Sequence, residues 1–289
     1  MAGEAEQQLR AYVDYLRDLG IHDFYRQGES VFAEVVSTAI VSVAEPSVVR
    51  SSIVATAVVV EEPRAIPVPS RPAFLEPPIA KLVSFDDLAP LPESRVAPAH
   101  KADALVAIKE EIGDCTRCPL AYAGRRTIVF GDGDANAKLM FVGEGPGADE
   151  DASGVPFVGK AGQLLNNMIQ AMGLKREQVY IANVVKCRPP ANRTPEPVEA
   201  NTCDQFLLQQ IDVVQPEVVV ALGATAATYL LGVKRSLSAL RGHWHSCRGA
   251  KLAVTYHPAF LLRDPGMKGE AWKDLQMVMK EMGLKAPAR

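Results

Sequence analysis

Four short apolar runs in the second half of the chain constrain the fold most strongly. Each run is apolar nearly throughout, rather than at alternate positions, as expected of strands buried on both faces. Helical stretches lie between and after the runs, an alternation typical of a parallel sheet covered by helices. The expected strands are 138–142, 179–184, 217–222 and 251–256, and the expected helices are 160–173, 195–212, 224–231 and 270–282. We therefore predict an α/β fold, a three-layer α/β/α sandwich with a central four-stranded parallel sheet.

The residues just beyond these runs are expected to form one site. In a parallel sheet of this kind, ligands bind in a crevice beyond the carboxyl ends of the strands. The stretch GEGPGADED, residues 143–151, follows the first run, Asn183 lies near the end of the second, and His257 follows the fourth. The predicted topology therefore gathers acids, an amide and an imidazole around one crevice.

The glycine-rich stretch does not match a phosphate-binding loop. Gly143, Gly145 and Gly147 lie two residues apart, the next helix begins only near Gly159, and no Gly-Lys-Ser/Thr follows. The four carboxylates of the stretch would repel a phosphate unless metals intervened. Two interpretations stay open. The glycines allow the backbone close to a neutral ligand while a carboxylate handles water, or the stretch is an acidic surface turn.

Two further segments also have a structural and a functional interpretation. Phe157 stands in a loop before a helix, where it is either a core residue or an aromatic face for a planar base. The stretch YHPAFLLRD, residues 256–264, is either a helix start with buried leucines or a more specialised loop. In the second case it presents a crevice histidine, an apolar wedge and a phosphate-binding arginine.

The cysteines indicate a metal site. Five cysteines without a secretion signal argue against a disulfide framework. Four thiolates can hold a tetrahedral zinc ion or an iron–sulfur cluster, and the wide second spacing here does not match a zinc ribbon. Cys247 lies near His243 and His245, and we interpret that group as structural. The four expected ligands are Cys115, Cys118, Cys187 and Cys203.

The first hundred residues differ in character from the rest. Residues 1–30 contain an amphipathic helical stretch, which we expect to dock on the main domain or on a protein partner. Residues 31–100 hold 10 of the 21 prolines and no glycine, and we predict a mostly disordered linker. A strand within the Val-rich part, 35–60, is the alternative. Residues 101–289 form the expected globular domain.

Charge and hydropathy restrict the class of protein. Residues 1–100 carry 8 Lys and Arg against 14 Asp and Glu, whereas residues 101–289 carry 23 against 20, a positive bias compatible with nucleic acid. No apolar stretch reaches the roughly 20 residues that a membrane helix needs. We expect a cytoplasmic, monomeric protein without membrane contact.

Together, the motifs resemble one family. GEGPGADED, PFVGKAGQLL, NVVKCRPPANRTP, YHPAFLLR and the four cysteines occur in the order and spacing of a family 4 uracil-DNA glycosylase. The resemblance covers about residues 105–283 and leaves residues 1–100 unexplained. It implies the uracil-DNA glycosylase fold, and an enzyme that hydrolyses the N-glycosidic bond of uracil in DNA to leave an abasic site for base-excision repair.

The resemblance also implies roles for the crevice residues. Phe157 would stack on the flipped uracil, Asn183 would read its O4 and N3–H edge, and His257 would hydrogen-bond O2. Glu144 would orient or activate water and stabilise the cationic sugar, and Glu150 would crowd C5 and so reject the methyl group of thymine.

Further residues would contact O2, DNA and the cofactor. The backbone at Gly145 would assist at O2, Leu261 or Leu262 would fill the vacated stack, and Arg263 would bind phosphate. The four cysteines would ligate a [4Fe–4S] cluster with a structural role. Family 5 carries an apolar residue where Glu144 stands. The covalent uracil-binding variant carries a basic insert where this chain reads NRTPEPVE. This chain differs from both, which favours ordinary family 4 hydrolysis.

Two hypotheses from other classes stay open on the sequence. The first is a non-catalytic uracil-DNA-binding or polymerase-associated module on the same fold. The second is a nucleotide-binding α/β protein with zinc. The sequence does not indicate strand preference, activity on other deaminated bases, the partner of residues 1–100, or how Glu144 and Glu150 divide their work.

Overall fold

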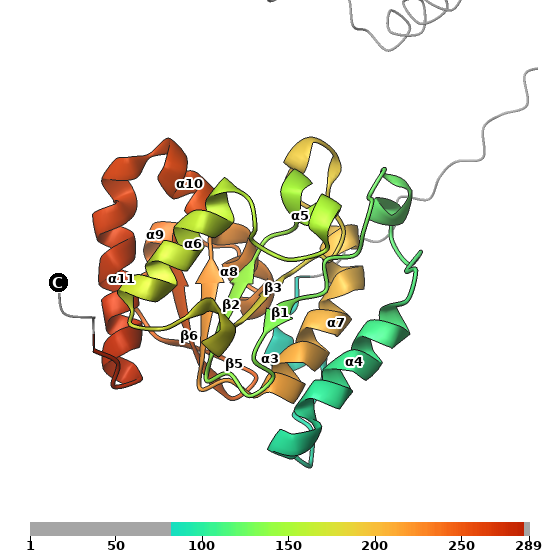
Figure 1. Ribbon diagram of the computed structural model, residues 1–289, viewed down its shortest axis with the longest axis horizontal. Helices are drawn as coiled ribbons and strands as arrows, with labels where there is room; N and C mark the ends of the chain where they lie inside the picture. Colours follow the sequence, from blue (N-terminus) through green and yellow to red (C-terminus); the bar gives the residue numbers. More distant parts are fainter. Residues whose placement is uncertain (1–81, 286–289) are drawn as a thin grey trace, which may run out of the picture. The chain divides into compact units, whose positions relative to one another are not determined.

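The computed structural model describes residues 82–285 and builds them around one six-stranded sheet (Figure 1). The strand order is β1-β3-β2-β4-β6-β5. The four central strands pair in parallel, and the two outer strands pair antiparallel to their neighbours. The strands are β1 (Asp132–Gly133), β2 (Leu139–Gly143), β3 (Tyr180–Asn183), β4 (Val218–Leu222), β5 (His245–Cys247) and β6 (Ala250–Thr255).

The central strands confirm the predicted parallel sheet, whereas the two edge strands were not predicted. β1 has only two residues and β5 reads HSC, so neither carries a hydrophobic pattern. Both form because a neighbouring strand offers free hydrogen-bonding groups at the sheet edge. The predicted four-stranded parallel centre is therefore confirmed, and two antiparallel edge strands extend the sheet to six.

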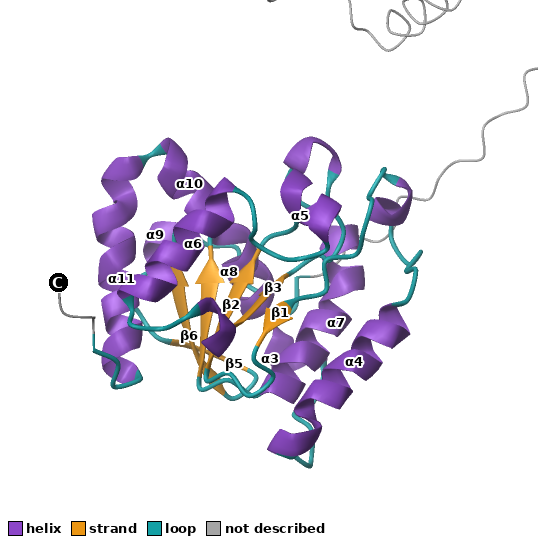
Figure 2. Ribbon diagram, viewed as in Figure 1, coloured by secondary structure: helices purple, strands orange, loops and turns teal. Residues whose placement is uncertain are grey.

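Helices cover both faces of the sheet, as the apolar runs predicted (Figure 2). The α-helices are α3 (Phe85–Leu88), α4 (Lys101–Ile112), α5 (Ala148–Ser153), α6 (Lys160–Ala171), α7 (Pro197–Val214), α8 (Ala224–Leu231), α9 (Leu237–Leu240), α10 (Pro258–Arg263) and α11 (Lys268–Glu281). Five short 3-10 turns complete the helices of residues 82–285: η1 (Pro98–His100), η2 (Pro119–Tyr122), η3 (Arg176–Gln178), η4 (Pro190–Asn192) and η5 (Pro265–Met267).

Two apolar clusters, one on each face of the sheet, form the core. Met140 and Val142 of β2 pack in the cluster that includes α4, α7 and α8 residues. Leu139 and Phe141 of the same strand pack in the cluster that includes α6 and α11 residues. Successive strand side chains point to opposite faces, so one wholly apolar run supplies both clusters. This is the physical basis of the three layers.

The end of the predicted linker belongs to the folded domain. Phe85 of α3 is 1% exposed and packs in the core. The buried Arg248 donates to the backbone carbonyls of Phe85 at 3.2 Å and Pro90 at 2.9 Å, and pairs with Asp212 at 2.6 Å. The linker boundary at residue 100 is therefore corrected, because this segment buries an aromatic side chain. The helix expected in 1–30 and the linker up to residue 81 lie outside the described residues.

Among the helices of residues 82–285, none combines the length and the apolar character that a bilayer crossing requires.

Candidate active site

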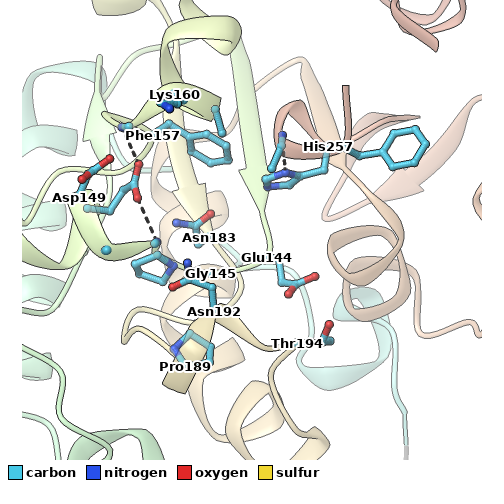
Figure 3. A pocket seen from close by; sticks show the side chains of 18 of the residues that line it. Glu144, Gly145, Asp149, Phe157, Lys160, Asn183, Pro189, Asn192, Thr194 and His257 are labelled. Carbon is cyan, nitrogen blue, oxygen red and sulfur yellow. Dashed lines mark hydrogen bonds between the residues drawn. The ribbon is translucent and has the colours of Figure 1, made fainter. Parts of the chain in front are cut away.

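A cavity of about 530 Å³ lies at the carboxyl ends of the central strands. Glu144 follows β2, Asn183 closes β3 and His257 follows β6, and all three line the cavity. Figure 3 shows their side chains around one space together with Phe157. The structure therefore brings together the crevice residues that the strand-end argument predicted.

Asn183 forms the most buried polar part of this cavity. Asn183 is only 1% exposed, and its side-chain oxygen, Oδ1, has no hydrogen-bond partner within the described part of the chain. Gly143 allows this placement, because a Cβ there would lie 2.4 Å from Asn183 Oδ1 and 2.5 Å from Phe157 Cζ. A buried acceptor without a partner is costly, so the cavity suits a ligand that supplies a donor.

Phe157 is held in the cavity wall by an unusual backbone. Its φ is 53°, in the left-handed region that non-glycine residues rarely adopt, and it is 5% exposed. The Arg176 guanidinium donates to the carbonyls of Phe157 at 3.1 Å and Pro156 at 2.6 Å. Gly162 packs under the same peptide, where a Cβ would lie 1.9 Å from the Phe157 oxygen. These contacts fix the ring facing the cavity.

Arg176 was missed by the sequence reasoning. It lies in η3, and Asp132 of β1 and Asn166 of α6 accept from its guanidinium at 3.2 and 3.0 Å. Nothing near Arg176 in the sequence points to Phe157, 19 residues earlier. The contact follows only from the packing of η3 against the loop before α6.

His257 is partly buried beside Phe157, with 5.6 Å between the ring centroids. Its Nδ1 accepts the backbone N–H of Ala259 at 3.1 Å, so the neutral ring carries its proton on Nε2. Burial, followed by the positive charge of Arg263, lowers the pKa of His257 to about 4. The imidazole is thus a neutral hydrogen-bond donor at ordinary pH.

The two predicted acids have different surroundings. Glu144 is partly buried and lines the cavity. Glu150 accepts backbone N–H bonds from Gly147 at 3.0 Å, Val158 at 2.9 Å and Gly159 at 3.0 Å. Both carboxylate oxygens of Glu150 are engaged, so this side chain joins the two loops that form one wall of the cavity.

Gly145, whose backbone the resemblance places near O2 of the base, also lines the cavity. A Cβ at this position would lie 2.8 Å from Val185 Cγ2. The absence of a side chain therefore lets the loop after β2 lie against the segment that follows Asn183.

Helix α10 separates the residues expected to contact DNA. Leu261 is 2% exposed and packs inward. The expectation that Leu261 could contact DNA is therefore corrected. Leu262 is 43% exposed, and Arg263 lines the cavity. The helix directs the two leucines to different surroundings, and only Leu262 is available as a wedge.

One wall of the cavity was not anticipated. The segment after Cys187 contributes Pro189, Asn192, Arg193 and Thr194 to the lining. The Arg193 guanidinium forms two hydrogen bonds of 2.8 and 2.7 Å with the buried carboxylate of Glu199. Polar residues in a Pro-rich stretch carry no periodic pattern, so the signal in the sequence was the motif NVVKCRPPANRTP, which contains these residues but assigned them no role. Asp149 and Lys160, to which no role was assigned from the sequence, also line the cavity.

The four predicted ligands surround a second, small cavity. Cys115, Cys118, Cys187 and Cys203 all line it, together with apolar side chains. Within residues 82–285, no three His, Cys, Asp or Glu side chains are arranged to hold a single metal ion. The fifth thiol, Cys247, is buried in β5 and is not part of this cavity's lining.

Donors already approach three of the sulfurs, including that of Cys115, to which Arg117 donates at 3.5 Å. Arg125 donates to Cys187 Sγ at 3.1 Å, and the backbone N–H of Lys186 donates to Cys203 Sγ at 3.3 Å. Hydrogen bonds to sulfur and apolar walls suit thiolates that ligate a cluster. The donor set therefore fits the predicted group.

Comparisons with known proteins agree with this arrangement. Residues 130–276 match the family model described as the Uracil DNA glycosylase superfamily. A type-4 uracil-DNA glycosylase of Thermotoga maritima is 48% identical over 159 residues, covering 54% of this chain and 82% of that protein. One of Pyrobaculum aerophilum is 43% identical over 178 residues, covering 59% and 90%. A type-5 enzyme of the latter organism is 30% identical, covering 50% and 78%.

Proposed function

The chain belongs to the type-4 uracil-DNA glycosylases of the uracil-DNA glycosylase superfamily, and we propose that its cavity receives a uracil flipped out of DNA. The reaction is hydrolysis of the N-glycosidic bond, which releases uracil and leaves an abasic site. The observation that carries this proposal is the buried, unpartnered Oδ1 of Asn183 on the cavity wall.

Asn183 supports selection of uracil over cytosine. Its Oδ1 would accept the N3–H of uracil, and its amide nitrogen would donate to O4. Cytosine has an acceptor at N3 and a donor at C4, so it would leave both groups of the amide unpaired. Such a mismatch costs about 1–3 kcal/mol for each buried group. The ring of Phe157 provides the stacking surface for the base.

His257 would stabilise the leaving base. As the glycosidic bond breaks, the electron pair stays with uracil, and negative charge develops on its O2. A neutral imidazole with the proton on Nε2 donates to that oxygen without giving its proton away. Removing a comparable donor from an oxyanion site costs about 3 kcal/mol. The backbone N–H groups near Gly145 would add to the same stabilisation.

The acids would act on the sugar side and on cavity shape. Glu144 would orient the attacking water and stabilise the positive charge that develops on the deoxyribose. Glu150 would hold the cavity wall through its three backbone bonds and, through that wall, restrict the space near C5 of the base. Leu262 would fill the gap left in the DNA stack, and Arg263 would bind a phosphate.

The cysteine cavity would hold a [4Fe–4S] cluster through Cys115, Cys118, Cys187 and Cys203. When bound, the cluster would cross-link chain segments more than 60 residues apart in sequence and so stabilise the fold. No step of the glycosylase reaction needs it.

A direct assay tests the function. An oligonucleotide with one uracil is incubated with the protein and then treated with alkali, which cleaves abasic sites. We expect cleavage at the uracil position with the wild-type chain and strongly reduced cleavage with Asn183→Ala. Absence of cleavage on both single- and double-stranded substrates would contradict the proposal. The visible absorption, iron and sulfide content of the same preparation test the cluster.

A further inference from the structure

A buried lysine lies between the base cavity and the cysteine cavity. Lys186 is 1% exposed, and its ammonium donates to the backbone carbonyl of Asn183 at 2.9 Å and to Gln210 Oε1 at 2.5 Å. The backbone N–H of the same residue donates to Cys203 Sγ at 3.3 Å. One residue thus contacts the backbone of the asparagine that faces the base and a cysteine of the second cavity.

Burying a lysine at this position costs more free energy than burying an apolar side chain of the same size. Both oxygens that accept hydrogen bonds from its ammonium are neutral, and a buried cation without a carboxylate partner is unfavourable unless the sulfurs of the cysteine cavity, which Lys186 also lines, balance its charge. Methionine would occupy a similar volume without that cost. The polar contacts of Lys186 are therefore the reason to look for a function in this side chain.

The neighbouring contacts hold the lysine in one position. Gln210 in turn donates to the carbonyl of Phe130 and to the Tyr180 hydroxyl, both at 3.0 Å. Gln210 and Cys203 lie on the same helix, α7, about two turns apart. Lys186 is therefore anchored along α7 at both its backbone and its side chain.

We propose that Lys186 is a positioning residue for base recognition, which joins Asn183 to the cysteine cavity. Its ammonium holds the peptide group directly after Asn183 and with it the direction of the Asn183 side chain. A displacement of about 1 Å in a group that orients the substrate can reduce a rate about a hundredfold. This proposal rests on the uracil-excising function proposed above.

The role predicts a specific kinetic signature. In Lys186→Met, we expect kcat for uracil excision to fall about ten- to a hundredfold, with KM for DNA within about twofold of the wild type. DNA contacts at the rim are unaffected, so binding of the duplex is retained. Lys186→Gln keeps an N–H donor and should recover part of the rate. The dissociation constant for free uracil, measured by titration calorimetry, should rise in Lys186→Met.

A second buried lysine supplies the matched control. Lys101 is 8% exposed and also donates to a backbone carbonyl, that of Val214 at 2.8 Å, but it lines neither cavity. Lys101→Met should lower stability without changing kcat or the affinity for uracil. Visible absorption of each variant shows whether its cysteine site is filled, independently of activity.

A double-mutant cycle decides whether Lys186 acts through Asn183. If it does, adding Lys186→Met to Asn183→Ala lowers the single-turnover rate little further. Equal losses in Lys186→Met and Lys101→Met, or fully multiplicative effects in the double variant, would overturn the proposal. If Lys186→Met does not fold, Lys186→Gln is judged by the same two criteria. A wild-type chain that releases no uracil would instead contradict the proposed function itself.

Discussion

The base cavity and the cysteine cavity both include residues of one short segment, 183–187. They differ in whether their hydrogen-bond acceptors already have partners. In the base cavity, Asn183 Oδ1 is buried without a partner. In the cysteine cavity, the sulfurs of Cys187 and Cys203 already accept hydrogen bonds from Arg125 and the Lys186 backbone. An open acceptor suits a ligand that comes and goes, whereas satisfied sulfurs suit a permanent cross-link.

The walls of the two cavities also differ in the side chains that line them and in the elements that carry those side chains. The base cavity is lined by acids, amides and aromatic rings on loops that follow the strands. The cysteine cavity is small and is lined by apolar side chains together with Arg117, Arg125 and Lys186. Its cysteines come from the segment before η2, from the loop before α7 and from α7 itself. Changes in the first cavity should therefore reduce activity at constant stability, and changes in the second should reduce stability first.

The largest effect on activity is expected at Asn183. Asn183→Ala removes both hydrogen bonds to the base, so kcat/KM for uracil excision should fall by about a hundredfold or more. The melting temperature should stay within about 2 °C of the wild type, because the lost acceptor has no partner in the free protein. Single-turnover excision and thermal melts measure the two effects. A large fall in melting temperature would contradict the expectation that changes in the base cavity reduce activity at constant stability.

Substitution of His257 is expected to give the next largest loss of activity. His257→Ala removes the donor to the developing charge on O2 and should lower the excision rate about a hundredfold, with KM for DNA little changed. The loss should appear in single-turnover rates, where product release does not contribute. A variant that raised KM at constant kcat would show that His257 binds DNA rather than the leaving base.

The cysteine cavity is expected to show the reverse order of effects. Cys187→Ala removes a ligand and should lower the melting temperature by about 10 °C or more, together with the visible absorption. Cys247→Ala is the matched control, since Cys247 is equally buried but lies outside the cavity, and it should cost only about 1 kcal/mol. If the two variants behave alike, the cysteine site is not a cross-link.

The neighbouring leucines of α10 offer a smaller test. Leu262→Ala should reduce excision from duplex DNA by about tenfold or less and leave the melting temperature unchanged, because the side chain is 43% exposed. Leu261→Ala should lower stability by about 2–5 kcal/mol through the cavity that it leaves. Excision from single-stranded DNA should be affected less by Leu262→Ala, since no stack has to be filled.

A further expected effect concerns the pH dependence of stability. The pKa of His257 is about 4 in the folded chain, below its usual value of about 6.5, so the unfolded chain binds this proton first as the pH falls. The free energy of unfolding should therefore decrease between about pH 6.5 and pH 4. His257→Gln should lose that part of the pH dependence in urea titrations. Equal slopes in the two proteins would contradict the lowered pKa.

Local patterns in the sequence were sufficient for the sheet and for the strand-end residues of the site. The four apolar runs became the four parallel strands because burial on both faces requires an unbroken apolar run. Once the strands are parallel, Glu144, Asn183 and His257 must meet at one edge, whatever the loops do. The family resemblance added the reaction and the cluster, which no periodic pattern contains.

Only the tertiary structure decided which neighbouring side chains support the site. Whether Leu261 or Leu262 faces outward depends on how α10 is rotated about its axis as it packs beside α6. The contacts of Arg176 with Phe157 and of Lys186 with Gln210 join residues 19 and 24 positions apart, and they depend on how separate elements pack. Hydrophobic periodicity describes the face that one element buries, whereas hydrogen bonds between elements exist only after the chain has folded.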